Sequence, residues 1–271
     1  MSLPNGKIVS CLQRHDVAIV NREVQGYFSN GLRLRPGDTV FDVGANIGLF
    51  TLAAYERGEQ NLRVYAFEPV PAIFDVLSAN VGRLASTGQL KVFDFGLSSS
   101  AGTVHFAYYP HAPVLSTAYP DRQADIEVIK EAILNNIMHL DEAPLAVRCL
   151  CWVPRFLRAP IVRSTLKRVL RPKSVTCQMQ TLSQVVRDHG IEQIDLLKID
   201  VEKAELDVLQ GVDARDWPKI QQIVVEVHDL DRRVDTITQL LLEKGLTRTT
   251  VEQPVTLRSS NIYTVFATRA H

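Results

Sequence analysis

Short apolar runs alternate with segments of helical period along most of this 271-residue chain. The runs Thr39–Val43 and Arg63–Phe67 are followed by segments 47–57 and 71–84, in which apolar residues recur every three or four positions. Strands that alternate with helices of about 10–15 residues form a mostly parallel sheet with helices on both faces. The alternation therefore predicts an α/β fold built on such a sheet.

The same alternation resumes in the second half of the chain. Further strands and helices are predicted in turn at 194–199, 201–210, 223–227 and 231–244. Two final strand-like stretches, 247–251 and 262–267, predict an antiparallel hairpin that closes the sheet. Two more strands are expected before the interruption, at 91–95 and at 103–108, the second of them in a hairpin or at a sheet edge.

Residues 111–175 interrupt this pattern, and we expect them to form an inserted helical lid over the active site, with the apolar stripe of its helix packed over the substrate pocket. A helix is predicted within 122–140, because apolar residues recur there at helical spacing: Ile126, Ile129, Ile133, Ile137 and Leu140. The chain is then a single domain, with an N-terminal extension at 1–35 and a core at 36–110 and 176–271.

A long stretch of this insertion has no acidic residue. No Asp or Glu occurs between Ala143 and Arg187, whereas the stretch 148–173 has eight basic residues: Arg148, Arg155, Arg158, Arg163, Lys167, Arg168, Arg171 and Lys173. Arg163, Lys167 and Arg171 would share one face of a helix. We expect these three to bind an acidic substrate or partner, such as a carrier protein with its phosphopantetheine arm. A solvated helix face is the alternative.

The charges of the whole chain cancel, with 30 basic and 30 acidic residues. A neutral total favours neither nucleic-acid nor membrane binding. No apolar run reaches the roughly 18 residues of a membrane helix, and the first residues lack the pattern of a signal peptide. We expect a cytoplasmic protein whose four cysteines are reduced. Cys149 and Cys151 have no second matching pair, so no metal site is expected.

The segment 41–48 predicts a cofactor site. Its sequence, Phe-Asp-Val-Gly-Ala-Asn-Ile-Gly, ends a strand with an acidic residue and opens a helix through glycines that let backbone approach a ligand. Glu68 ends the next strand, where a carboxylate can accept the hydroxyls of a ribose. The residues expected to contact the cofactor are Asp42, Gly44, Asn46, Gly48, Glu68 and Asp94, the last of them near the adenine.

Two kinds of cofactor use this geometry, and the first loop distinguishes them. A dinucleotide needs Gly-x-Gly-x-x-Gly around its pyrophosphate, but this loop lacks the close glycine pair. Asp42 would also place a carboxylate near that pyrophosphate. S-adenosylmethionine has no phosphate, and a carboxylate suits its positive sulfonium and amino groups. The loop favours S-adenosylmethionine; the alternatives are a nicotinamide-dependent oxidoreductase and a catalytically silent protein that binds a cofactor.

Three motifs resemble the FkbM-type methyltransferase family. They are the segments 42–51, 67–71 (Phe-Glu-Pro-Val-Pro) and 197–202 (Leu-Lys-Ile-Asp-Val-Glu), and the resemblance covers about residues 27–110 and 176–265. It implies a class I methyltransferase (Rossmann-like) fold, S-adenosylmethionine as the donor and usually O-methylation.

One departure from this family narrows the resemblance. Many members have glycine where this chain has Lys203. The form Asp-Val-Glu-Lys, followed by Trp217 and by Val-Glu-Val-His-Asp at 225–229, resembles the branch attached to polyketide and nonribosomal peptide pathways. The resemblance thus implies a hydroxyl of a natural-product intermediate as the acceptor.

Polar side chains follow two strands at the carboxyl edge of the predicted sheet, where ligands of such folds bind. Methylation of an alcohol needs a base for the hydroxyl proton. His228 is the candidate general base, since imidazole titrates near neutral pH, and Asp200 or Glu226 would orient it. Glu202 is expected to contact the substrate. Asp200 and Asp229 also suggest a divalent metal, but the sequence offers no convincing third oxygen ligand.

Overall fold

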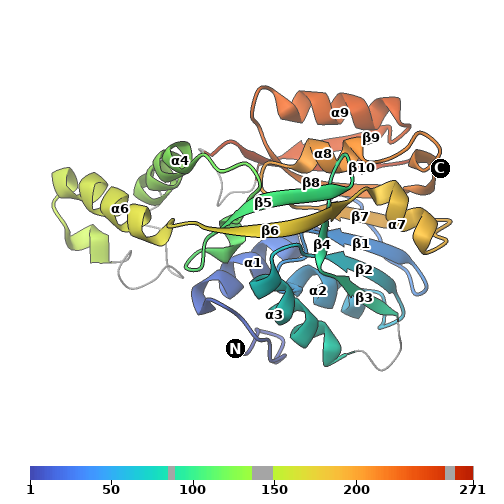
Figure 1. The fold of residues 1–271 in the computed structure, drawn as a ribbon, viewed down its shortest axis with the longest axis horizontal. Coiled ribbons are helices and arrows are strands. Elements are labelled where there is room, and N and C mark those ends of the chain that lie inside the picture. Colours follow the sequence, from blue (N-terminus) through green and yellow to red (C-terminus); the bar gives the residue numbers. More distant parts are fainter. Residues whose placement is uncertain (85–88, 136–148, 254–259, 271) are drawn as a thin grey trace.

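The computed structural model describes residues 1–84, 89–135, 149–253 and 260–270. Its centre is a seven-stranded sheet in the order β3-β2-β1-β7-β8-β10-β9 (Figure 1). The strands are β1 (Thr39–Val43), β2 (Arg63–Phe67), β3 (Leu90–Phe93), β7 (Leu196–Ile199), β8 (Gln222–His228), β9 (Arg248–Glu252) and β10 (Ile262–Thr268). The first five are parallel, and β10 is antiparallel to both of its neighbours. The predicted mostly parallel sheet with an antiparallel C-terminal pair is confirmed.

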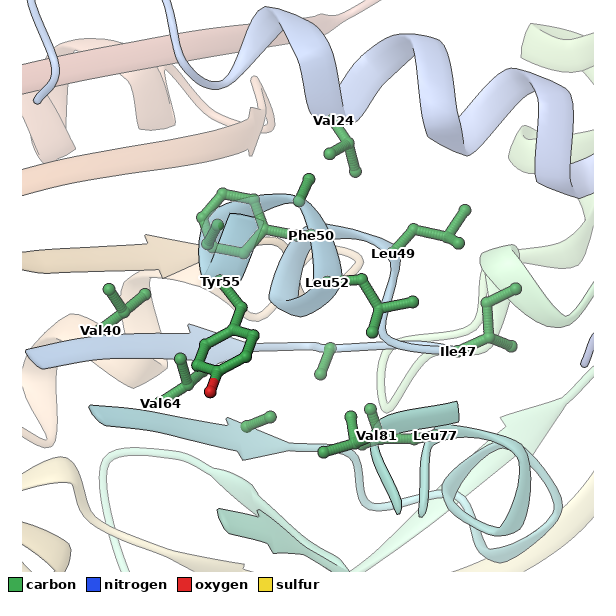
Figure 2. Packing of buried hydrophobic residues seen from close by; sticks show 14 of the residues in the cluster. Val24, Val40, Ile47, Leu49, Phe50, Leu52, Tyr55, Val64, Leu77 and Val81 are labelled. Atoms are coloured by element: carbon green, nitrogen blue, oxygen red, sulfur yellow. The ribbon is translucent and has the colours of Figure 1, made fainter. Parts of the chain in front are cut away.

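Helices cover both faces of this sheet (Figure 1). One face carries α1 (Arg14–Gly26), α2 (Leu49–Arg57) and α3 (Pro71–Gly82), and the other carries α7 (Leu182–Asp188), α8 (Glu205–Gln210) and α9 (Arg233–Glu243). Successive side chains of a strand point to opposite faces, so Val40 of β1 packs on the first face and Phe41 on the second. In Figure 2, Val24 of α1 lies above Phe50 of α2 on the first face. The N-terminal extension thus contributes a helix to the core.

A second sheet has three strands in the order β4-β6-β5. Its strands are β4 (Phe95–Leu97), β5 (Gly102–Tyr108) and β6 (Lys173–Gln180). The strand predicted at 91–95 is divided between the two sheets by a bend at Asp94. β5 lies at an edge, but its partner is the distant β6, so the two do not form a hairpin. Sequence analysis missed β6 because only Cys177 and Met179 are buried in it, which leaves no apolar run.

The insertion forms a helical hairpin of α4 (Arg122–Asn135) and α6 (Arg155–Val169), which projects from the ends of β5 and β6 (Figure 1). Three short 3-10 helices complete the described chain: η1 (Pro113–Leu115), η2 (Cys149–Trp152) and η3 (Trp217–Lys219). None of the described helices is both long and apolar enough to span a membrane.

The apolar stripe of α4 packs against α6. Ile126 is buried together with Val162 and Leu166, while Ile129 and Ile133 pack at the border of the same cluster. The expectation that this stripe covers a substrate pocket is therefore corrected for its described part, because α6 already covers it. The last two members of the predicted stripe, Ile137 and Leu140, lie outside the described residues.

Candidate active site

The two glycines of the turn between β1 and α2 have no room for a side chain. Gly44 has a φ of 74°, and a Cβ atom there would lie 1.8 Å from the backbone oxygen of Asp200. Gly48 has a φ of 88°, and a Cβ atom there would lie 2.8 Å from Leu77 Cδ1. Both backbone conformations favour glycine. The turn therefore packs directly against the carboxyl end of β7.

A buried lysine ties this turn to β7. Lys198 donates to the Gly44 carbonyl at 2.7 Å and forms ion pairs with Asp42 at 3.1 Å and with Asp200 at 3.5 Å. Burial would lower the pKa of Lys198, but these carboxylates raise it, so the ammonium stays charged. Asp42 also accepts a hydrogen bond from the Thr51 hydroxyl at 2.6 Å. The carboxylate expected to face a cofactor is thus fully buried and supports the turn from behind.

Glu68 lies at the carboxyl end of β2, beside the same turn. Its carboxylate accepts hydrogen bonds from the backbone N–H groups of Asn46 at 3.1 Å and Val70 at 3.0 Å. Burial raises the pKa of Glu68 to about 7, although these N–H groups oppose the shift. The Asn46 side chain accepts a hydrogen bond from the next N–H in the turn. Asp94 is exposed at the bend after β3, on the same edge of the sheet.

Acidic side chains gather around Tyr27, the residue that follows α1. Its hydroxyl donates to Glu226 at 2.9 Å and lies 3.2 Å from Asp200. Burial and the nearby carboxylates of Asp200 and Glu202 raise the pKa of Glu23, on the same helix, to about 8. Burial likewise raises the pKa of Glu226 well above its usual value, and Asp200 and Glu23 add to the effect. A cluster of acids that raise one another's pKa favours a nearby cation.

His228 lies between two glutamates, and neither is the predicted partner. Its Nε2 is 3.2 Å from Glu202 Oε2, and its Nδ1 is 2.7 Å from Glu205 Oε1. Burial would lower the pKa of His228, but these two carboxylates raise it to about 11. The ring is therefore an imidazolium at neutral pH. This disagrees with a free general base oriented by Asp200 or Glu226, both of which contact the Tyr27 hydroxyl instead.

The turn after β7, which carries Glu202, has a strained backbone. Glu202 has a φ of 27° and Lys203 a φ of 75°, a region that side-chain-bearing residues rarely adopt. Three contacts hold the turn. The Thr117 hydroxyl donates to the Glu202 carbonyl at 2.6 Å, Arg233 donates to the Lys203 carbonyl at 2.6 Å, and Lys203 Nζ pairs with Asp125 of α4 at 2.5 Å. The hairpin thus contacts the site through this turn.

A small hollow opens beside the glycine turn. Its walls come from α1 and the residues just before it, from the turn itself and from η1: Leu12, Gln13, Asp16, Val20, Asn46, Ile47, Pro113 and Val114. The N-terminal segment therefore forms one wall of this hollow. It also supplies Tyr27 to the acidic cluster.

Comparison with known proteins decides the family. The model of the methyltransferase FkbM domain matches residues 161–246. The 31-O-demethyl-FK506 methyltransferase FkbM of Streptomyces tacrolimicus is 35% identical over 99% of this chain and 96% of its own. The chain belongs to the FkbM methyltransferase family. The AMB antimetabolite synthetase AmbE of Pseudomonas aeruginosa is also 35% identical over 99% of this chain, which spans only 12% of that relative's length.

A solved FkbM methyltransferase from Methylobacillus flagellatus shares the fold. It superposes with a TM-score of 0.54 at 12% identity and covers 88% of this chain, which spans 45% of that one. The chain is thus an S-adenosylmethionine-dependent methyltransferase with a class I, Rossmann-like fold. The nicotinamide-dependent oxidoreductase and the silent binding protein are set aside.

The residues of this FkbM methyltransferase fit S-adenosylmethionine. The Gly44 turn lies at the carboxyl end of the sheet, where ligands of such folds bind, and Asn46 and Ile47 of the turn line the hollow beside it. Glu68 is buried at the strand end where a ribose is bound in related folds, and burial is the cause of its raised pKa. The acidic cluster around Tyr27 suits the sulfonium and ammonium groups of the donor.

The basic face of the hairpin is only partly as predicted. Arg163 pairs with Glu127 of α4 at 2.8 Å, so its charge is neutralised within the hairpin. Lys167 and Arg171 are exposed, as predicted for a docking surface, and Arg168 lies beside them. Towards the start of α6 the surface becomes apolar, since the side chains of Trp152 and Phe156 are 90% and 78% exposed and Leu157 and Ile161 are also exposed.

Several site residues of this FkbM methyltransferase escaped sequence analysis. Tyr27 and Glu23 come from the N-terminal segment, whose sequence has no motif. Lys198 and Glu205 lie inside or next to a recognised motif, but only the fold shows that they contact Asp42 and His228. The four cysteines are free thiols. Among the described residues, no three His, Cys, Asp or Glu side chains are grouped as a metal site.

Proposed function

We propose that this enzyme transfers a methyl group from S-adenosylmethionine to a hydroxyl of a natural-product intermediate. The observation that carries the proposal is the Glu202–His228 ion pair, which lies where β7 and β8 end, next to the Gly44 turn. The name of the Streptomyces relative supports an oxygen acceptor, since it specifies a 31-O-demethyl compound. In this proposal the enzyme is cytoplasmic.

The chemistry requires a positioned hydroxyl and an acceptor for its proton. When bound, the donor supplies a methyl group on a positively charged sulfur. The chain holds Glu202 in a fixed turn beside the glycine loop, with one carboxylate oxygen on His228. Burial raises the pKa of Glu202 although His228 opposes the shift, which makes this carboxylate a stronger base than one in water. An alcohol acceptor needs such a group.

In this proposal, the natural-product intermediate is attached to an acidic carrier protein when it is methylated. The AmbE relative supports it, because the matching region is a small part of a much longer synthetase. In and after the last turn of α6, Lys167, Arg168 and Arg171 are exposed, and the other end of this segment is apolar because Trp152 and Phe156 are exposed there. An aromatic anchor together with exposed positive charge suits an acidic protein surface.

Mass spectrometry of hydroxyacyl substrates tests the proposed function. Each substrate is offered both as a carrier-bound thioester and as a small soluble thioester, with S-adenosylmethionine. The expected product gains one methylene mass, located on oxygen by fragmentation. Products methylated only on nitrogen or carbon across the panel would contradict the proposal.

Reversal of the exposed positive charges tests carrier recognition separately from the methyl transfer. The triple variant Lys167→Glu/Arg168→Glu/Arg171→Glu should lower kcat/KM for the carrier-bound substrate by at least about tenfold at low salt, and less at high salt, because screening shortens the reach of the charges. The small thioester should be unaffected. A matched control reverses Arg63, Lys91 and Arg248, which are exposed on the β-strands. Equal effects of both variants would remove the carrier from the proposal.

A further inference from the structure

Four side chains form a continuous charged row. Glu202 Oε2 lies 3.2 Å from His228 Nε2, His228 Nδ1 lies 2.7 Å from Glu205 Oε1, and Glu205 Oε2 lies 3.1 Å from Arg233. The two ends are partly exposed, at 19% for the Glu202 side chain and 20% for that of Arg233, whereas the His228 side chain is 8% exposed and that of Glu205 is fully buried. Glu202 is therefore the carboxylate of the row that is open to solvent.

Both ring nitrogens of His228 face carboxylate oxygens. A neutral ring has only one N–H, so one of the two contacts would place a nitrogen lone pair against a carboxylate lone pair. The imidazolium satisfies both contacts, but it has no free nitrogen to take another proton. Glu205 cannot replace it as a base, because its carboxylate is buried and receives hydrogen bonds from Arg233 and from the Lys203 N–H at 3.0 Å.

We infer that Glu202 is the catalytic base and that His228 is a positioning residue that remains protonated throughout the reaction. The inference rests on the proposed transfer to a hydroxyl. The substrate O–H bond breaks and its proton goes to a Glu202 oxygen. The oxygen electron pair forms the new O–C bond, while the electron pair of the breaking S–C bond stays on sulfur. Glu202, which is partly exposed, then returns the proton to solvent.

The backbone of the turn aims Glu202. Its left-handed φ and that of Lys203 are kept by the Thr117 hydroxyl and by Arg233, the same residue that contacts Glu205. Strain of this kind persists only where neighbouring contacts over-determine the conformation, and it is concentrated at functional sites. Arg233 thus contacts both the backbone of the turn and Glu205. These two contacts couple the position of Glu202 to that of His228.

The charged groups around Glu202 come from four elements. His228 on β8 lowers its pKa, whereas burial, Asp200 at the end of β7 and Glu205 on α8 raise it. Glu23 on α1 and Glu226 on β8 are further acidic neighbours. Removal of the His228 charge should therefore move the acid limb of the kcat profile to higher pH, because the protonated form of Glu202 becomes more stable.

The decisive comparison is between Glu202→Gln and His228→Gln. Glu202→Gln keeps the shape of the side chain and an oxygen for His228, but cannot accept a proton. We expect kcat to fall by about a hundredfold or more, while the Kd for S-adenosylmethionine, measured calorimetrically, changes by less than about threefold. The loss should shrink for a substrate analogue with a more acidic hydroxyl. His228→Gln should lower kcat by a smaller factor and should shift the acid limb of the kcat profile to higher pH.

Nitrogen NMR of histidine-labelled enzyme adds a readout that does not depend on turnover. We expect His228 to show the shifts of an imidazolium at pH 8, and to lose them in Glu202→Gln/Glu205→Gln. A neutral ring in the wild type at pH 8, or full activity of Glu202→Gln, would overturn the inference. The wild type tests the proposed function separately. If it methylates no hydroxyl, that proposal fails first, whereas a hydroxyl product with an active Glu202→Gln variant rejects this inference alone.

Discussion

The cofactor end of the main sheet and the α4–α6 hairpin use charge in opposite ways. At the cofactor end the charges are buried and fixed, as Lys198 is by Asp42 and Asp200. On the hairpin, Lys167 and Arg171 lie outside a small apolar core. Buried groups in fixed contacts set protonation and position, whereas exposed charges act at longer range on what approaches. The difference places the chemistry in the first region and the proposed recognition in the second.

The largest expected effect belongs to the glycine turn. Gly44→Ala must adopt a left-handed φ and also displace the Asp200 carbonyl, so we expect a loss of about 3–5 kcal/mol in the free energy of unfolding. Cofactor binding should disappear as well. Gly37→Ala is the matched control, because its φ is also positive, at 94°, but nothing lies within 4 Å of the added Cβ. It should cost only about 1–2 kcal/mol.

Urea unfolding of both glycine variants measures the difference. Similar midpoints for the two would mean that the turn can move away from β7. The close packing of Gly44 on Asp200 would then not define the cofactor end.

The next effect compares the two apolar cores. Leu77→Ala opens a cavity under the glycine turn, and Leu166→Ala opens one inside the hairpin. Leu→Ala in a core costs about 2–5 kcal/mol, and we expect the upper part of this range for the fully buried Leu77. Hydrogen exchange should increase across the main sheet in the first variant but only in the hairpin in the second. Faster exchange of β1 in Leu166→Ala would show that the two regions unfold together.

Local sequence determined the main sheet better than the site. The bounds predicted for β1 and β2 agree with the structure, because each is an apolar run ended by a turn signal. The partners of His228 could not be predicted, since only the turn after β7 brings Glu202 and Glu205 onto β8. Tyr27 reaches the acidic cluster from the end of the N-terminal segment, whose sequence has no chemical motif.

The hairpin shows the same limit in another form. The apolar stripe predicted a helix within 122–140, and α4 is present there. What each face contacts depends on α6, which covers Ile126 and neutralises Arg163 through Glu127. Periodicity gives the face of an element but not the element that packs on it. Sequence alone could therefore predict neither that α6 covers the apolar stripe of α4 nor that Arg163 pairs with Glu127.

Calorimetric titration with S-adenosylmethionine tests most directly whether the carboxyl end of the sheet, and not the hairpin, binds the donor. Glu68→Ala should weaken binding by about 1.5–3 kcal/mol, the range for a hydrogen bond to a charged group. The triple charge reversal at Lys167, Arg168 and Arg171 should leave the Kd unchanged, because these side chains are exposed on the hairpin. Unchanged affinity in a folded Glu68→Ala variant, or a loss confined to the hairpin variant, would contradict this assignment of the cofactor site.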